Sequence, residues 1–191
     1  MNPTISRLDE QRVLDTFLRL VRIDSPSGQE QALAEHLEPE LRQLGLETWR
    51  DETGNVLGRR AGRGQGAGQP ALLFSAHMDT VQPGCAIQPQ LAEGVIRSDG
   101  TTILGADDKA GITAILEALR QVEADGLDCR PVEVAFTVQE ETGLTGAKQL
   151  DKAALRSRQA VVLDSNGPVG TIVNQAPASD SIQVVVYGKA A

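Results

Sequence analysis

Three short segments rich in apolar residues constrain the fold of this chain more than any other feature. They span residues 71–76, 132–138 and 160–163, and stretches with helical spacing of apolar residues lie before and between them. Short apolar runs are typical of strands buried inside a parallel sheet. Because helices and strands alternate along the chain, the sequence predicts an α/β fold with helices on both faces of the sheet.

Apolar residues that recur with a helical period predict three longer helices, at residues 7–22, 28–44 and 108–124. Ser6 with Asp9, and Ser27 with Glu30, have the three-residue spacing of capping boxes, which predicts where the first two helices begin. Shorter elements are predicted as a helix at residues 144–151 and as strands at residues 46–50, 55–60, 95–98, 169–175 and 181–187.

The charge and composition of the chain exclude several classes of function. A net charge of −8 and only 3% of aromatic residues argue against a nucleic-acid-binding protein. No apolar run reaches the ~18 residues of a membrane span, and the two cysteines lack metal-site spacing. The glycine-rich segment 61–69 lacks the Gly-Lys-Ser/Thr ending of a phosphate loop, so a flexible surface loop is predicted. The expected protein is cytoplasmic and binds neither nucleic acid nor membranes.

Polar residues suited to a metal site follow the apolar segments or begin the third long helix. In chain order they are His77, Asp79, Asp107, Asp108, Glu140, Glu141 and Asp164. Each alone is typical of a turn or a helix cap. Together they would lie at one rim, because the carboxyl ends of parallel strands meet at one edge of a sheet.

Several carboxylates at one rim need a counter-charge, since two like charges ~4 Å apart repel by about 4 kcal/mol at an effective dielectric near 20. No cluster of Lys or Arg accompanies them in the sequence, which favours divalent metal ions. Imidazole with carboxylates and no thiolate suits Zn²⁺, Mn²⁺ or Co²⁺. Asp79 could accept the second ring N–H of His77. Of the neighbours Glu140 and Glu141, one can bind a metal ion while the other accepts a proton.

Four ordered motifs, SAHMDTVQPG, SDGTTILGADDKAGITAIL, QEETGLTGAK and VLDSNGPVG, closely resemble the peptidase T-like branch of the dinuclear zinc exopeptidases. Carboxypeptidase G and succinyl-diaminopimelate desuccinylase are more distant relatives. The resemblance implies a zinc-exopeptidase-like catalytic domain, with a mixed sheet flanked by helices, and an inserted α+β lid domain. It also implies a cis peptide bond between Asp107 and Asp108.

The same resemblance implies a role for each site residue. His77, Asp107 and Asp164 would hold one metal ion, and Asp107 would bridge to a second ion. Glu141 would also bind the second ion. Glu140 would be the general base for a metal-bridging water, and Asp79 would orient His77. The implied cofactor is a pair of divalent ions, Zn²⁺ before Mn²⁺ or Co²⁺.

The family pattern also predicts a division of the chain. Residues 1–175 would be the N-terminal part of the catalytic domain, and residues 176–191 the start of the lid. The family's second-metal histidine and its lid histidine lie beyond position 191, and His36 is predicted to be a surface residue. We therefore expect a truncated chain that is inactive by itself.

The implied function is a metal-dependent hydrolase that cleaves amide bonds of small peptides, as a tripeptidase or aminopeptidase. The small peptide would be its substrate, and a homodimer would form through the lid. An N-acyl amino acid deacylase, a carboxypeptidase of the same family and an inactive fragment stay open as alternatives, because the metal ligands are shared. A dinucleotide-binding domain is excluded, because no Gly-x-Gly-x-x-Gly joins a strand to a helix.

Overall fold

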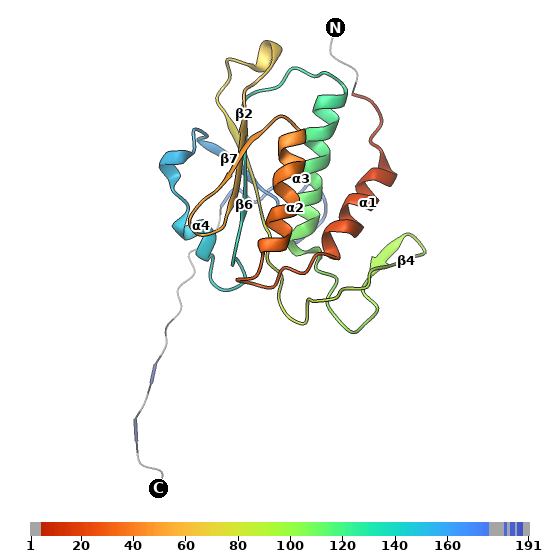
Figure 1. Ribbon diagram of the computed structural model, residues 1–191, viewed down its shortest axis with the longest axis vertical. Helices are drawn as coiled ribbons and strands as arrows, with labels where there is room; N and C mark the ends of the chain where they lie inside the picture. Colours follow the sequence, from red (N-terminus) through yellow and green to blue (C-terminus); the bar gives the residue numbers. More distant parts are fainter. Residues whose placement is uncertain (1–4, 176–181, 183, 186, 189–191) are drawn as a thin grey trace.

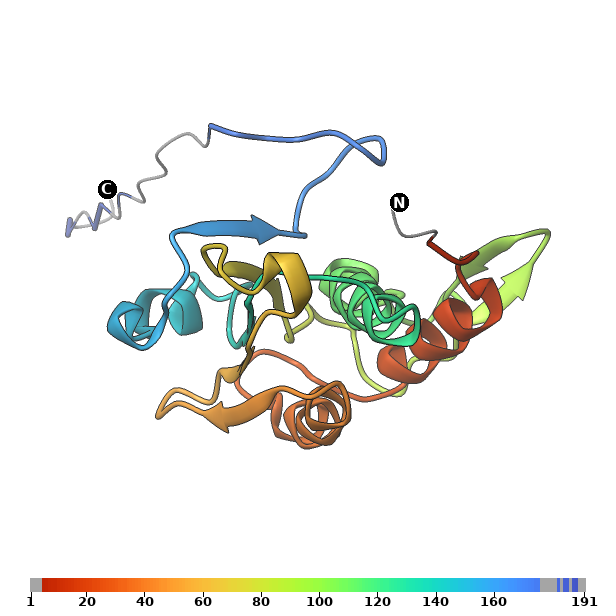
Figure 2. The same ribbon diagram turned by 90° about the horizontal axis from the view of Figure 1, so that it is seen from above.

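The computed structural model describes residues 5–175, 182, 184, 185, 187 and 188. In this part of the chain, three long helices pack on one side of a five-stranded mixed sheet and a short helix lies on the other side (Figures 1 and 2). The helices are α1 (Glu10–Val21), α2 (Gln31–Gln43), α3 (Ala106–Ala124) and α4 (Thr145–Gln149). The strands are β1 (Glu47–Arg50), β2 (Val56–Arg60), β3 (Leu72–His77), β6 (Val132–Thr137) and β7 (Gln159–Val162) in the main sheet, with β4 (Gln90–Ala92) and β5 (Val95–Arg97) in a separate ribbon.

The main sheet has the strand order β1-β2-β6-β3-β7. β3 is parallel to β6 and to β7, whereas β2 is antiparallel to β1 and to β6. The predicted α/β fold with a mixed sheet is confirmed, and β3, β6 and β7 end at the same edge. Among the described residues, no helix is long and apolar enough to cross a membrane.

Helices lie on both faces of the sheet, as predicted, but they cover the two faces unequally (Figure 2). The long helices α1, α2 and α3 share one side of the sheet (Figure 2). The helix that follows β6, α4, has only five residues and is too short to form a second layer. The edge strand β7 is exposed, and its Val162 is 61% accessible.

Alternating residues of the central strand fill the core between sheet and helices. Val132, Val134 and Phe136 of β6 lie in one cluster with Leu37 of α2 and Leu116 of α3. Burying a side chain of this size contributes about 1.5–3 kcal/mol. The end of β6, where site residues follow, is therefore firmly fixed against the helices.

The first two helices begin differently from the prediction. Asp9, and not Ser6, caps α1 by accepting a hydrogen bond from the Arg12 backbone N–H at 3.0 Å. The capping box predicted for α2 is wrong, because the Ser27 hydroxyl donates to Asp79 Oδ2 at 2.7 Å. Ser27 thus contacts a predicted site residue instead of a helix end.

The glycine-rich segment 61–69 lies mostly at the surface, as predicted, but backbone hydrogen bonds tie it to the segment before β6. Arg63 pairs with Cys129 through two backbone hydrogen bonds of 2.7 and 3.0 Å. A Cβ atom at Gly62 or Gly66 would lie 2.7 or 2.4 Å from backbone atoms of Cys129. The glycines therefore allow close packing of two backbone segments.

The strand predicted at residues 169–175 is also wrong. Gly170 has a φ of +94°, which interrupts extended backbone, and Ile172 is 88% exposed. No strand includes these residues in the described part of the chain. The strand predicted at 181–187 and the lid segment 176–191 lie, apart from five residues, outside the described residues.

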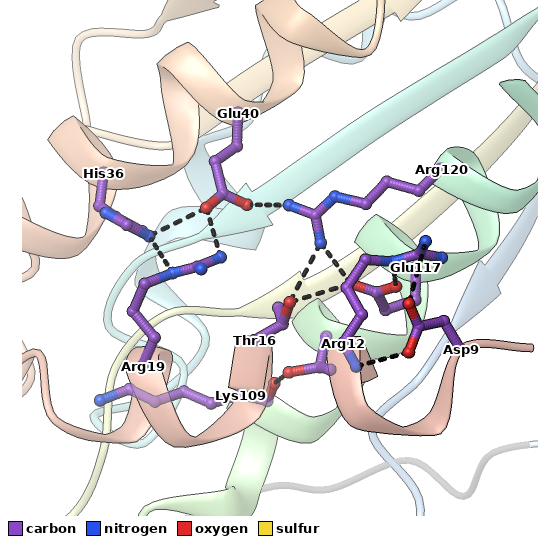
Figure 3. A network of polar contacts seen from close by, with 10 residues as sticks. Asp9, Arg12, Thr16, Arg19, His36, Glu40, Lys109, Glu117 and Arg120 are labelled. Atoms are coloured by element: carbon purple, nitrogen blue, oxygen red, sulfur yellow. Dashed lines mark hydrogen bonds and ion pairs between the residues drawn. The ribbon is translucent and has the colours of Figure 1, made fainter. Parts of the chain in front are cut away.

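A cluster of charged side chains joins the three long helices (Figure 3). Glu117 of α3 accepts hydrogen bonds from Arg12 Nε at 2.6 Å and from Thr16 Oγ1 at 2.9 Å. It also binds Arg120, which in turn donates to Glu40 of α2 at 2.6 Å. Burial raises the pKa of Glu117, but these hydrogen bonds outweigh burial and hold the pKa below its ordinary value of 4.5.

Replacing Glu117 by Leu is expected to lower the free energy of unfolding by about 3 kcal/mol, because two arginines lose their buried partner. Because the pKa of Glu117 is depressed, its contribution is present above pH 4.5 and is lost as the pH falls below that value. Urea denaturation at pH 7 and at acid pH measures both effects. The Glu10→Leu variant, changed at an exposed position of α1, is the control; an equal loss in that variant would contradict the role of Glu117.

Candidate metal centre

The predicted site residues converge where β3, β6 and β7 end. His77 ends β3, Glu140 and Glu141 follow β6, Asp164 follows β7, and Asp107 lies in the first turn of α3. Two groups of these residues have ligand atoms within 4.8 Å of one another. One group is His77, Asp107 and Asp164, and the other is His77, Glu140 and Glu141. The structure thus brings together all the residues predicted as metal ligands or general base.

His77 is buried between the other groups. Its Nδ1 lies 2.9 Å from the Asp79 carbonyl oxygen and 3.4 Å from Asp79 Oδ1, and its Nε2 lies 3.2 Å from Asp107 Oδ1. A proton on Nδ1 that is donated to this carbonyl leaves Nε2 free as a ligand. Burial lowers the pKa of His77, but Asp79, Asp108 and Asp164 outweigh burial and raise it to about 9.

Asp79 is fully buried and holds the loop after β6. Its Oδ1 accepts the Glu140 N–H at 2.8 Å, and its Oδ2 accepts the Glu141 N–H at 3.1 Å as well as the Ser27 hydroxyl. Burial raises the pKa of Asp79, but hydrogen bonds from His77, Ser27 and these N–H groups lower it to about 2. The sequence predicted a bond between Asp79 and His77, but no pattern indicated the contacts with the Glu140–Glu141 loop.

The start of α3 is irregular at its two aspartates. The Asp107–Asp108 peptide bond is cis, as the family resemblance implies, and both residues have non-helical dihedrals. Asp108 Oδ1 accepts the Gly111 N–H at 3.2 Å, whereas its buried Oδ2 has no partner among the described residues. Burial and the charges of Asp164 and Asp107 raise the pKa of Asp108 to about 7. A Cβ at Gly111 would lie 2.7 Å from the Leu163 carbonyl oxygen, so glycine permits this close approach.

The charges of the site fit a divalent metal ion. Burial raises the pKa of Glu140 and of Glu141, and nearby carboxylates, Asp79 and Asp107 among them, raise both further against the lowering effect of His77. A bound cation would neutralise these carboxylates and remove their mutual repulsion. Imidazole and carboxylate donors suit Zn²⁺, Mn²⁺ and Co²⁺, and the unpartnered oxygen of Asp108 is consistent with a nearby cation.

The Zn²⁺ affinity of the metal-free protein is expected to rise between pH 6 and pH 8. His77 must release a proton before Nε2 binds a metal ion, and its pKa of about 9 keeps it protonated over this range. One released proton changes the affinity by about tenfold per pH unit. Calorimetric titration in buffers with different ionisation enthalpies measures the affinity and the number of protons. A pH-independent affinity would contradict ligation by His77.

Known proteins are similar to this chain in sequence. Residues 73–185, which include every predicted site residue, match peptidase family M20/M25/M40. The uncharacterized protein YqjE of Bacillus subtilis is 38% identical, over 96% of this chain and 51% of the relative. Peptidase T of Desulfitobacterium hafniense is 34% identical, over 84% of this chain and 49% of the relative. The chain spans about half the length of the curated relatives it matches.

Solved structures of similar proteins have the same fold. The aminopeptidase PepT from Bacillus cereus has a TM-score of 0.82 and 37% identity, over 85% of this chain and 45% of that chain. A tripeptidase from Staphylococcus aureus has a TM-score of 0.82 and 37% identity, over 86% of this chain and 46% of that chain. The resemblance that the motifs indicated is confirmed, and the chain belongs to peptidase family M20/M25/M40 as a peptidase T-like member.

Proposed function

We propose that this protein, with divalent metal ions bound, hydrolyses amide bonds of small peptides. The observation that carries the proposal is the convergence of His77 with carboxylates from three other segments, in two groups whose ligand atoms lie within 4.8 Å. The relatives named peptidase T, aminopeptidase and tripeptidase support a peptide substrate. A cytoplasmic location and a homodimer stay predictions from the sequence.

The proposed metal ligands divide into two sets. His77, Asp107 and Asp164 would hold one ion, and Asp107 together with Glu141 would hold the second. When bound, the ions would polarise the scissile carbonyl and lower the pKa of a water toward about 7. The close approach of His77 Nε2 to Asp107 Oδ1, at 3.2 Å, supports a shared ion at the first set.

Glu140 is the proposed general base. Its carboxylate would take a proton from the attacking water and pass it to the nitrogen of the leaving amine. The hydrogen bond from its backbone N–H to Asp79 fixes where the side chain starts. Its raised pKa suits this exchange, because a base that is too weak would not accept the proton.

A substrate panel on the intact Zn²⁺-loaded protein tests the proposal, because the 191 residues by themselves are expected to be inactive. We expect release of the free N-terminal residue from tripeptides, loss of this activity after chelation, and recovery with added Zn²⁺. Hydrolysis of N-acetyl amino acids, or release of the C-terminal residue alone, would favour the deacylase or the carboxypeptidase of the same family. No hydrolysis of any amide by protein with bound Zn²⁺ would contradict the proposal.

A further inference from the structure

Lys109 is a buried lysine that the proposed chemistry does not use. It directly follows Asp107 and Asp108, and its side chain, 0% exposed, extends from α3 toward the end of α1 (Figure 3). Its Nζ donates to the Ile23 carbonyl oxygen at 2.7 Å, which is its one hydrogen-bond acceptor within the described part of the chain. Burying an ammonium disfavours folding, because one hydrogen bond replaces only part of its hydration. Fold stability therefore does not explain a lysine here.

The carbonyl group of Ile23 belongs to a segment that supports the end of β3. In this segment, the buried Ser25 hydroxyl donates to the Met78 carbonyl oxygen at 2.8 Å. Two residues later, the Ser27 hydroxyl donates to Asp79 Oδ2 at 2.7 Å. A shift of Ile23 would therefore move Met78 and Asp79, which directly follow His77. Through Asp79 it would also move the Glu140–Glu141 loop.

The buried ammonium thus joins the two arms of the candidate metal centre. One arm is the start of α3, which carries Asp107, and the other is the end of β3, which carries His77. Metal–ligand distances tolerate deviations of only about 0.2 Å, so a small displacement of one arm weakens binding. We propose that Lys109 is a positioning residue, which fixes Asp107 relative to His77 by binding the Ile23 carbonyl. This inference rests on the metal centre of the proposed function.

The Lys109→Met variant of the full chain tests the inference, because Met keeps the length of the side chain and removes the ammonium. We expect Zn²⁺ affinity, measured by calorimetry, to fall about tenfold. The free energy of unfolding in urea should stay unchanged or rise, since an apolar side chain is better suited to a buried site. In the metal-free variant, the Gly111 N–H, bound to Asp108, should exchange with solvent faster. Lys148→Met, at an exposed position of α4, is the matched control.

A Lys109→Met variant with unchanged Zn²⁺ affinity and unchanged Gly111 exchange would overturn the inference. A loss of affinity that only parallels a loss of stability would also overturn it, since that is the result of a structural role. Ser25→Ala removes the hydrogen bond from the Ser25 hydroxyl to the Met78 carbonyl and should weaken Zn²⁺ binding about as much as Lys109→Met does. If Lys109→Met does not fold, a wild-type Zn²⁺ affinity in Ser25→Ala overturns the inference. Wild-type protein that binds no Zn²⁺ would contradict the proposed function. The exchange of the Gly111 N–H in metal-free Lys109→Met would still test the positioning role of Lys109, because it needs no bound ion.

Discussion

Replacing Glu140 by Gln in the intact protein is expected to lower kcat for tripeptide hydrolysis by about 10²–10⁴-fold, the usual contribution of a general base, which is the role proposed for Glu140. The amide has the size of the carboxylate, and the backbone N–H of residue 140 keeps its hydrogen bond to Asp79. The side-chain amide introduced by this substitution cannot accept the proton of the attacking water. Zn²⁺ affinity should therefore stay close to the wild-type value, and the loss should appear in kcat when protein saturated with Zn²⁺ is assayed.

The geometry also allows a second role for Glu140, because its ligand atom lies within 4.8 Å of those of His77 and Glu141. The Glu141→Gln variant separates the two roles, since a lost ligand should weaken Zn²⁺ binding first. Glu52→Gln, in the exposed turn between β1 and β2, controls for the loss of one charge. A Glu140→Gln variant that loses as much Zn²⁺ affinity as Glu141→Gln would identify Glu140 as a ligand and refute the general base.

The place of the site could be predicted from the sequence because strand ends are marked locally. At His77 and at Asp164 the chain changes from apolar to polar residues, and this change coincides with the end of β3 and closely follows the end of β7. Parallel pairing of these strands then brings both residues to one edge. The predicted bounds lie within one residue of the observed ones for β1, β2, β3, β5, β6 and β7, and within two residues for α3 and α4. Short apolar runs mark β3, β6 and β7, and a regular apolar period marks α3.

The contacts around the site could not be predicted, because they depend on segments far apart in the chain. Ser27 has the spacing of a helix cap, yet it binds Asp79, which lies 52 residues away. Lys109 follows an apparent helix start, but its partner Ile23 lies 86 residues away. A local pattern reports the period of an element and not the identity of the neighbour that packs against it. These positioning contacts become visible only when α1, α3 and β3 are assembled.

The arrangement of the sheet shows a similar limit. Apolar runs predicted buried parallel strands with helices on both faces, and the mixed sheet came only from the family resemblance. The antiparallel pairing of β2 with β6 adds two strands beyond the parallel part. The long helices lie on one face of the sheet only. The connection after β6 supplies the other face with just the five residues of α4, which is too short for a second layer. Periodicity predicts each element but does not show which face of the sheet it covers.

Replacing Asp79 by Asn is expected to weaken Zn²⁺ binding by about 100-fold, the upper end of the effect of residues that support a metal ligand. The Asp79 carboxylate accepts backbone N–H groups from Glu140 and Glu141 on different oxygens. An amide nitrogen cannot accept a hydrogen bond, so either orientation of the substituted amide sets an NH₂ group against one of these donors. The loop that carries both glutamates must then move, and His77 loses the negative charge beside its ring.

The acid dependence of stability gives an independent measure of the same carboxylate. Because the pKa of Asp79 is about 2, below its ordinary value of 3.8, its charge stabilises the fold above pH 3.8 and this contribution is lost as the pH falls toward 2. Urea unfolding of the metal-free protein should show this loss in wild type and a smaller one in Asp79→Asn. Ser27→Ala removes one of the donors to Asp79 and should weaken Zn²⁺ binding less. Equal Zn²⁺ affinities in wild type and Asp79→Asn would mean that the buried carboxylate does not couple His77 to the glutamate loop.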